Sequence, residues 1–139
     1  MEKLNNIEIF NGVVGKIFGH LYENFPVPVP IETNKFAAEL VEEDEFDGFW
    51  AVREIAEATV PWLVDAGYIK VNAIDQIYCE GVLTAKALEI LKIPDALNSE
   101  ETFGKKLVDT SKGAFNTALN NAVAQVVSLG FKLSTTGNV

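Results

Sequence analysis

Residues 59–71 read Thr-Val-Pro-Trp-Leu-Val-Asp-Ala-Gly-Tyr-Ile-Lys-Val. Apolar residues in the first half recur at helical spacing, whereas the second half begins a β-prone run. Gly67 lies between the two halves, and a left-handed cap at the end of a helix favours glycine. The stretch therefore predicts a helix that turns directly into a strand.

A second β-prone run follows at residues 76–83, Gln-Ile-Tyr-Cys-Glu-Gly-Val-Leu. Together with residues 68–72 it predicts a two-stranded hairpin. Thr84 then begins a helix, which we expect to stop before Pro94 because the residue before a proline is disfavoured in helical geometry. The order on this side is helix, hairpin, helix.

On the other side of residues 59–71, apolar spacing predicts one helix over residues 7–25 and a short one that begins at Thr33 or Asn34. The prolines between them predict an extended connector, which is either a short edge strand or a polyproline ligand. A third helix is predicted over residues 49–67. Because Pro61 interrupts its hydrogen bonding, the helix either kinks there or restarts with Thr59 as its N-cap, and we expect the restart.

The segment after Pro94 predicts one long helix over about residues 102–129, preceded by a cap at Asn98 or Ser99. No charge occurs in residues 113–131. The run has the length of a membrane span, but its asparagines and glutamine are costly in lipid, and it lacks the basic residues of a helix that lies on a membrane. We expect it to dock on the rest of the chain or to pair with a second copy. One face is Phe115, Ala118, Leu119, Ala122, Val123 and Val126.

Two phrases in this pattern resemble winged helix-turn-helix proteins. The first is Leu63-Val-Asp-Ala-Gly-Tyr-Ile, like the turn from a recognition helix into the first wing strand, and the second is Leu83-Thr-Ala-Lys-Ala, where the superfamily has Leu-Thr-x-Lys-Gly. The resemblance covers about residues 7–93. It implies a mainly α fold with a small β-hairpin: a winged-helix-like domain over residues 1–94, a C-terminal helical extension over 95–133 and a flexible tail over 134–139.

Acidic residues are concentrated in one part of the chain. The net charge is -9, and residues 36–69 hold nine acids against Arg53 alone, which gives -8 of that total. Binding to a polyanion is opposed by such a charge, because Lys and Arg supply most non-specific affinity for nucleic acid.

The resemblance implies that the helix before Gly67 and the wing contact DNA in members that bind it. The positions that match are Arg53, Thr59, Lys70, Asn72 and Gln76, and Lys105 and Lys106 add positive charge elsewhere. We keep a DNA-binding regulator as an alternative, although the surrounding acids make nucleic acid a poor partner.

Acids and aromatic residues together favour a protein partner, possibly a basic one, because aromatic residues ringed by charge are common interface anchors. The alternatives are that the aromatic residues belong to the core and that the acidic run is a solvated loop. The candidate partner-binding residues are Glu43, Asp44, Glu45, Asp47, Trp50, Arg53, Glu54, Glu57 and Trp62.

Neither a catalytic nor a metal-binding motif is present in the sequence. His20 is the one histidine and Cys79 the one cysteine, so a Ser-His-Asp unit, a Cys/His metal site or an internal disulfide has no support. We expect no cofactor, no enzyme activity and a reducing cytoplasm. The leading hypothesis is a non-catalytic, self-associating protein-interaction module. A DNA-binding regulator and a membrane-associated effector are the alternatives.

Overall fold

The computed structural model describes residues 4–40, 46–73, 79–95 and 98–136. Within these ranges the fold is mainly helical, with small antiparallel sheets and a long C-terminal helix, which confirms the predicted fold class. The elements in chain order are α1 (Asn6–Asn24), β1 (Val29–Pro30), α2 (Thr33–Leu40), α3 (Phe46–Asp65), β2 (Ile69–Ala73), β3 (Cys79–Leu83), α4 (Ala85–Leu91), β4 (Pro94–Asp95), β5 (Asn98–Thr102), α5 (Phe103–Thr110) and α6 (Thr117–Thr136).

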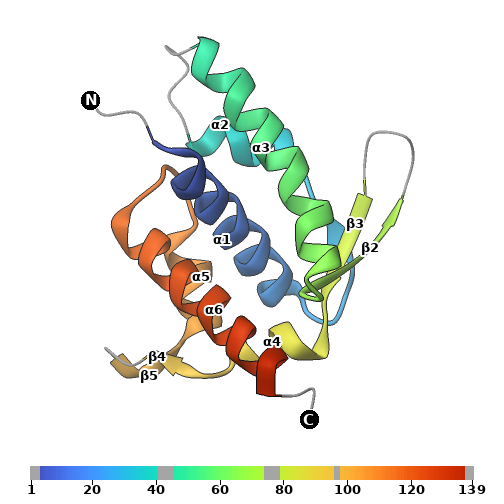
Figure 1. Cartoon of the computed structure of the whole chain (residues 1–139), viewed down its shortest axis with the longest axis vertical. Coiled ribbons are helices and arrows are strands. Elements are labelled where there is room, and N and C mark those ends of the chain that lie inside the picture. Colours follow the sequence, from blue (N-terminus) through green and yellow to red (C-terminus); the bar gives the residue numbers. More distant parts are fainter. Residues whose placement is uncertain (1–3, 41–45, 74–78, 96–97, 137–139) are drawn as a thin grey trace.

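Helix α1 is the centre of the molecule, with α3 on one side and α5 and α6 on the other (Figure 1). Val13, Val14, Ile17 and Phe18 are fully buried on it. Its glycines are buried as well, and they are sites of close approach rather than of unusual backbone geometry. A Cβ at Gly19 would lie 2.9 Å from the carbonyl oxygen of Leu107 on α5.

The three-stranded sheet has the order β1-β3-β2 and is antiparallel throughout. Ile69 is paired with Leu83 and Val29 with Gly81. The connector after α1 therefore supplies an edge strand, which is one of the two alternatives predicted for it. Residues 6–83 thus have the order helix, strand, helix, helix, strand, strand. A separate pair, β4 and β5, precedes α5.

The turn from α3 into β2 is as predicted. Gly67 has φ +84°, and the amide of Tyr68 donates to the carbonyl of Leu63 at 2.9 Å. Thr84 caps α4 by accepting from the amide of Ala87, also as predicted.

The predicted restart at Thr59 is wrong, because α3 continues through Pro61. Thr59 is buried, and its hydroxyl donates to the carbonyl of Ile55 at 2.7 Å instead of capping a new helix. Val60 and Leu63 lie on either side of Pro61 and keep one buried face with Val52 and Ala56. Burial of that continuous face offsets the local cost of the proline, about 3 kcal/mol.

The single helix predicted over residues 102–129 is also wrong, because two helices meet at an angle there (Figure 1). Thr102, not Asn98 or Ser99, caps α5, and residues 98–102 form β5. Gly113 has φ +93°, which ends helical geometry. The side-chain Nδ2 of Asn116 donates to the carbonyl of Thr110, and its Oδ1 accepts from the backbone amide of Leu119, each at 2.8 Å, so Asn116 caps the start of α6.

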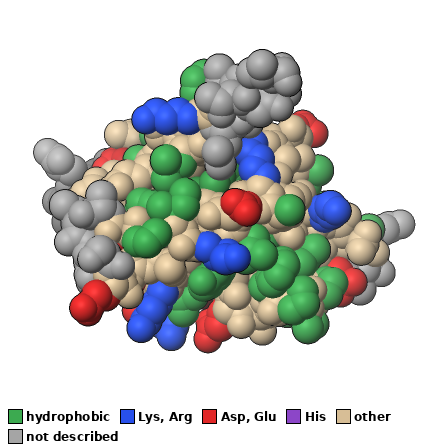
Figure 2. Space-filling view, turned by 90° about the horizontal axis from the view of Figure 1, so that it is seen from below, with side chains coloured by type: hydrophobic (Ala, Val, Ile, Leu, Met, Phe, Trp, Pro, Cys, Tyr) green, Lys and Arg blue, Asp and Glu red, His purple; other side chains and the backbone are tan. Residues whose placement is uncertain are grey.

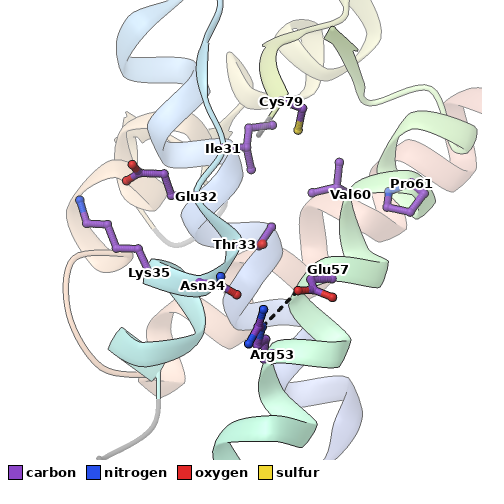
Figure 3. A pocket seen from close by; sticks show the side chains of 10 residues that line it. All are labelled: Ile31, Glu32, Thr33, Asn34, Lys35, Arg53, Glu57, Val60, Pro61 and Cys79. Carbon is purple, nitrogen blue, oxygen red and sulfur yellow. Dashed lines mark hydrogen bonds and ion pairs between the residues drawn. The ribbon is translucent and has the colours of Figure 1, made fainter. Parts of the chain in front are cut away.

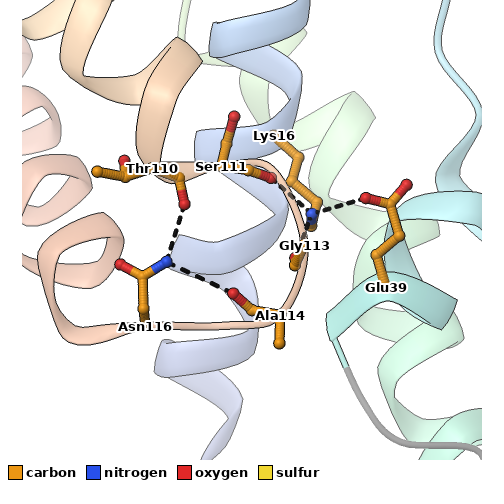
Figure 4. Close-up of polar contacts among 7 residues, drawn as sticks. All are labelled: Lys16, Glu39, Thr110, Ser111, Gly113, Ala114 and Asn116. Carbon is orange, nitrogen blue, oxygen red and sulfur yellow. Dashed lines mark hydrogen bonds and ion pairs between the residues drawn. The ribbon is translucent and has the colours of Figure 1, made fainter.

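Lys16 fixes this α5–α6 connection onto α1 (Figure 4). The residue is 3% exposed, and its ammonium donates to the carbonyls of Ser111 and Gly113, each at 2.7 Å, and to the carboxylate of Glu39 at 3.0 Å. A buried charge is costly unless it is paired and hydrogen-bonded. The three acceptors meet that requirement and join α1, α2 and the α5–α6 turn at one point.

The uncharged C-terminal face packs on the rest of the chain. Leu119, Ala122 and Val123 are fully buried and Val126 is 1% exposed, so these four are not free to contact a second copy. Phe115 is half-buried and Ala118 is exposed. Helix α6 includes the first three residues of the predicted tail, and residues 137–139 lie outside the described residues. Of the helices in the described ranges, none has the length and hydropathy needed to cross a membrane.

We predict that Gly19→Ala lowers the free energy of unfolding by about 1–3 kcal/mol, although alanine is about 1 kcal/mol better than glycine in an unhindered helix. The added methyl group meets backbone atoms of Leu107, which cannot rotate aside as the end of a flexible side chain could. Urea unfolding measures the change. The exposed Glu23 on the same helix supplies the control, Glu23→Ala, and a Gly19→Ala protein as stable as wild type would contradict the close approach.

Candidate protein-interaction site on helix α3

One side of α3 is exposed over residues 51–65 and carries little positive charge. Val52, Ala56 and Leu63 are buried against the core, whereas the exposed positions of the described side chains are Ala51, Glu54, Glu57, Ala58, Pro61, Trp62 and Asp65. A hollow lies on each side of this exposed ridge, and the two hollows differ in chemistry.

The first hollow lies between the start of α2, α3 and β3, with a volume of about 620 Å³ (Figure 3). Arg53 and Glu57 lie together at one end, and Nε of Arg53 donates to the carboxylate of Glu57 at 3.2 Å. Ile31, Val60 and Cys79 lie towards the other end. With Glu32 and Lys35 on the rim, the lining holds two acids and two bases. Its formal charge is therefore balanced.

The structure does not gather the predicted DNA-contacting residues into one basic surface. Arg53 is paired with Glu57, and Thr59 is 1% exposed with its hydroxyl on the carbonyl of Ile55. Lys70 and Asn72 are exposed on β2, and Gln76 lies outside the described residues.

The two further lysines do not complete such a surface. Lys105 and Lys106 are on α5, across the molecule from the hairpin (Figure 1), and the ammonium of Lys106 pairs with Asp95 at 2.5 Å. Only Lys105 of this pair is exposed.

The second hollow is an apolar groove of about 370 Å³ between the first turns of α1 and the middle of α3. We call it the α1–α3 groove. Its lining residues are Asn6, Ile7, Phe10, Ile55, Ala58, Thr59 and Trp62. Ile7 is 60% exposed and Trp62 45% exposed, large fractions for apolar side chains in the described part of the chain.

Trp62 is packed on one side and exposed on the other, so it is not a fully buried core residue. Its ring meets Phe10 edge to face at a centroid distance of 5.0 Å and stacks on Tyr68 at 6.3 Å. Aromatic pairs at these separations are favourable beyond the area they bury. The indole is therefore held in position while almost half of its surface faces solvent.

Tyr68 is a rigid support for Trp62. The phenol is 3% exposed, its hydroxyl donates to the carbonyl of Val127 at 3.4 Å, and burial raises its pKa. The ammonium of Lys86 lies 4.5 Å from the centre of the same ring and donates to the carbonyl of Ala66 at 2.9 Å.

The partner-binding residues predicted from sequence fall into two groups. Arg53, Glu54, Glu57 and Trp62 lie on α3, with Glu54 and Glu57 exposed. Asp47 and Trp50 belong to the first turns of α3, but their side chains are outside the described part, as are residues 43–45 altogether.

Five groove residues were missed from sequence: Asn6, Ile7, Phe10, Ile55 and Ala58. The helical spacing of Ile7 and Phe10 put them on the same face as Val14, and nothing local distinguishes Ile7 from a core residue. A signal was present in Trp62, because an aromatic ring near the end of an acidic helix predicts apolar neighbours around it.

His20 and Cys79 are of the residue types that often mark an active site, but their contacts in this fold are those of structural residues. Nε2 of His20 lies 3.1 Å from the carbonyl of Pro30. Burial raises the pKa of the Cys79 thiol, which favours its unreactive protonated form. Across the described ranges, no three His, Cys, Asp or Glu side chains lie close enough together to hold a metal ion.

A third groove, of about 450 Å³, lies at the end of the molecule that carries α4 and the end of α6. It is lined by Ile93, Pro94, Phe103, Ala124, Gln125, Ser128, Leu129 and Lys132. Seen from below, side chains of both charges are interspersed among the apolar ones on this face (Figure 2). The excess of one charge that characterises residues 36–69 is not a feature of this end.

No family model, curated protein sequence or solved structure matches this chain.

We predict that Tyr68→Phe reduces the loss of stability at alkaline pH. The pKa of Tyr68 is higher in the folded than in the unfolded state, so its contribution to stability is complete below the unfolded value, about pH 10. The contribution is lost as the pH rises through the folded value. Denaturant unfolding of both proteins from about pH 9 to about pH 11 measures the difference between the two slopes, and parallel slopes would contradict the assignment.

Proposed function

We propose that this chain is a non-catalytic, winged-helix-like protein-interaction module that binds a partner protein through the exposed side of α3. One observation carries the proposal: a half-exposed, rigidly supported tryptophan lines an apolar groove on the most acidic segment of the chain. Anchored aromatic side chains are the residues that contribute most to binding energy at protein interfaces.

Membership of the winged helix-turn-helix superfamily is part of the proposal. The element order from α1 to β3, the strand order β1-β3-β2 and the glycine turn from α3 into β2 support it. Fold by itself does not specify function, because one scaffold serves many. The partner class therefore rests on the surface of α3 and not on the superfamily.

The charge of α3 favours a basic protein over nucleic acid. Phosphate contacts require lysines and arginines, and the exposed ridge offers Glu54, Glu57 and Asp65 where such contacts would form. The one arginine of this helix is paired with Glu57. A basic partner gains from the same acids, chiefly through faster association and exclusion of wrong partners.

Self-association through α6 is not part of the proposal, because the predicted face is largely buried within the chain. A non-catalytic role is supported by the raised pKa of Cys79 and by the hydrogen bonding of His20 to a backbone carbonyl. The proposed compartment is a reducing cytoplasm, in keeping with a single cysteine.

We predict that Glu54→Lys with Glu57→Lys weakens partner binding by at least about tenfold, because the pair replaces attraction by repulsion. Tagged protein is recovered from its native host cells after nuclease treatment, the retained protein is identified and purified, and its affinity is measured for wild type and variants. The control pair, Glu23→Lys with Glu89→Lys, reverses two exposed acids on α1 and α4 and changes the net charge equally.

Equal weakening by the two pairs would show a non-specific charge effect and overturn the assignment to α3. Recovery of nucleic acid without nuclease, and of no protein partner in either sample, would overturn the proposed function in favour of a nucleic-acid-binding role.

A further inference from the structure

The α1–α3 groove has a shape and a lining that favour one kind of occupant. Its volume of about 370 Å³ is at the low end of the usual range for small-molecule sites. Small-molecule sites also place a few polar groups to orient the ligand. Here the lining offers Asn6 and Thr59, and the hydroxyl of Thr59 is already used on the carbonyl of Ile55. The groove therefore favours apolar side chains and offers few polar groups that could orient a small polar molecule.

Two helices border the groove, with α1 supplying Ile7 and Phe10 and α3 supplying Ile55, Ala58 and Trp62. Both walls are helix surfaces and neither is the edge of a sheet, so the groove offers no edge for an added strand. An amphipathic helix fits instead, because its apolar side chains recur at i, i+3 or i+4 and i+7 on one face.

The charged groups around the groove specify the polar face of that helix. Glu54 and Asp65 are exposed on α3, one turn or less along the helix from Ile55 and Trp62 respectively, whereas Glu57 lines the first hollow. Arg53 pairs with Glu57, and the ammonium of Lys86 is held by Ala66 and the ring of Tyr68. The acids beside the groove disfavour binding of an acidic or phosphorylated segment. They favour a helix whose polar face carries lysine or arginine.

We propose that the α1–α3 groove binds a basic amphipathic helix of the partner protein, with two or more apolar side chains of that helix against Ile7 and Trp62. The inference rests on the proposed function and deepens it. Ile7 and Trp62 supply exposed apolar area at the groove, and the acids on the α3 side lie where the lysines or arginines of such a helix pass.

The test uses defined peptides and the whole chain. The probe is a labelled helix of leucine and lysine in amphipathic order, about 18 residues and about five turns long. A second peptide has glutamate in place of every lysine, and a third has the same leucines and lysines in alternating order, which destroys the helical apolar face. Fluorescence anisotropy gives each affinity at physiological salt. Indole N–H signals in two-dimensional NMR report whether Trp62 is contacted.

We expect the amphipathic lysine peptide to bind and to shift the Trp62 indole signal, and the other two peptides to bind at least about tenfold more weakly. Ile7→Ser should weaken the lysine peptide by about tenfold, because it removes exposed apolar area without adding charge. Val27 is 61% exposed, close to the 60% of Ile7, and lies away from the groove, so Val27→Ser should leave the affinity within about twofold.

Ala58→Lys is a second, independent variant. It adds a bulky positive group to the groove at an exposed helical position and should also weaken binding by about tenfold, whereas Ala124→Lys on the exposed side of α6 should not. Thermal unfolding of each variant checks that it folds. Equal binding of the glutamate or alternating peptide, or equal effects of groove and control variants, would overturn the inference.

The proposed function and this inference fail in different ways. A partner protein that is lost with the Glu54 and Glu57 reversal but does not compete with the lysine peptide would overturn the groove assignment and leave the function standing. Absence of any partner that depends on α3 would overturn the function itself.

Discussion

Close packing around α1 is the constraint on which the rest of the structure depends. Gly12, Gly15 and Gly19 remove side chains where Leu40 of α2, Leu119 of α6 and Leu107 of α5 approach, so three helices contact α1 more closely than any larger residue would permit. The buried ammonium of Lys16 then joins α1 to Glu39 and to the α5–α6 connection. A helix enclosed in this way is stable only when all its neighbours are in place.

This enclosure also determines which surface stays free. The residues of α1 from Ile9 to Gly19 are almost all buried, and α5 and α6 use the C-terminal face that sequence alone left open to a second copy. Ile7 lies two residues before the enclosed part, opposite the middle of α3. Trp62 lies at the same site and packs against the rings of Phe10 and Tyr68. The apolar surface that remains exposed lies beside the acids of α3. The proposed partner helix therefore has an apolar face and a basic polar face.

Features that depend on neighbouring residues were predictable from the sequence, and features that depend on distant ones were not. Gly67 and Thr84 act as caps because local backbone chemistry requires them. Pro61 was misread because burial of Val60 and Leu63 outweighs a local rule. The break before α6 was missed because Gly113 and Asn116 stand in a run without charges, where they read as helix-packing residues. The exposure of Ile7 depends on how far α3, α5 and α6 extend along α1, which no local pattern encodes.

Helices α1, α5 and α6 are expected to unfold as one cooperative unit, and native-state hydrogen exchange tests this most directly. Amides of α1 from Val13 to Phe18 and of α6 from Ala122 to Val126 are followed in increasing, sub-denaturing concentrations of denaturant. We predict that the slowest amides of both helices converge on the free energy of global unfolding. Exchange of the α6 amides through a separate opening of lower free energy, while the α1 amides stay protected, would contradict the claim.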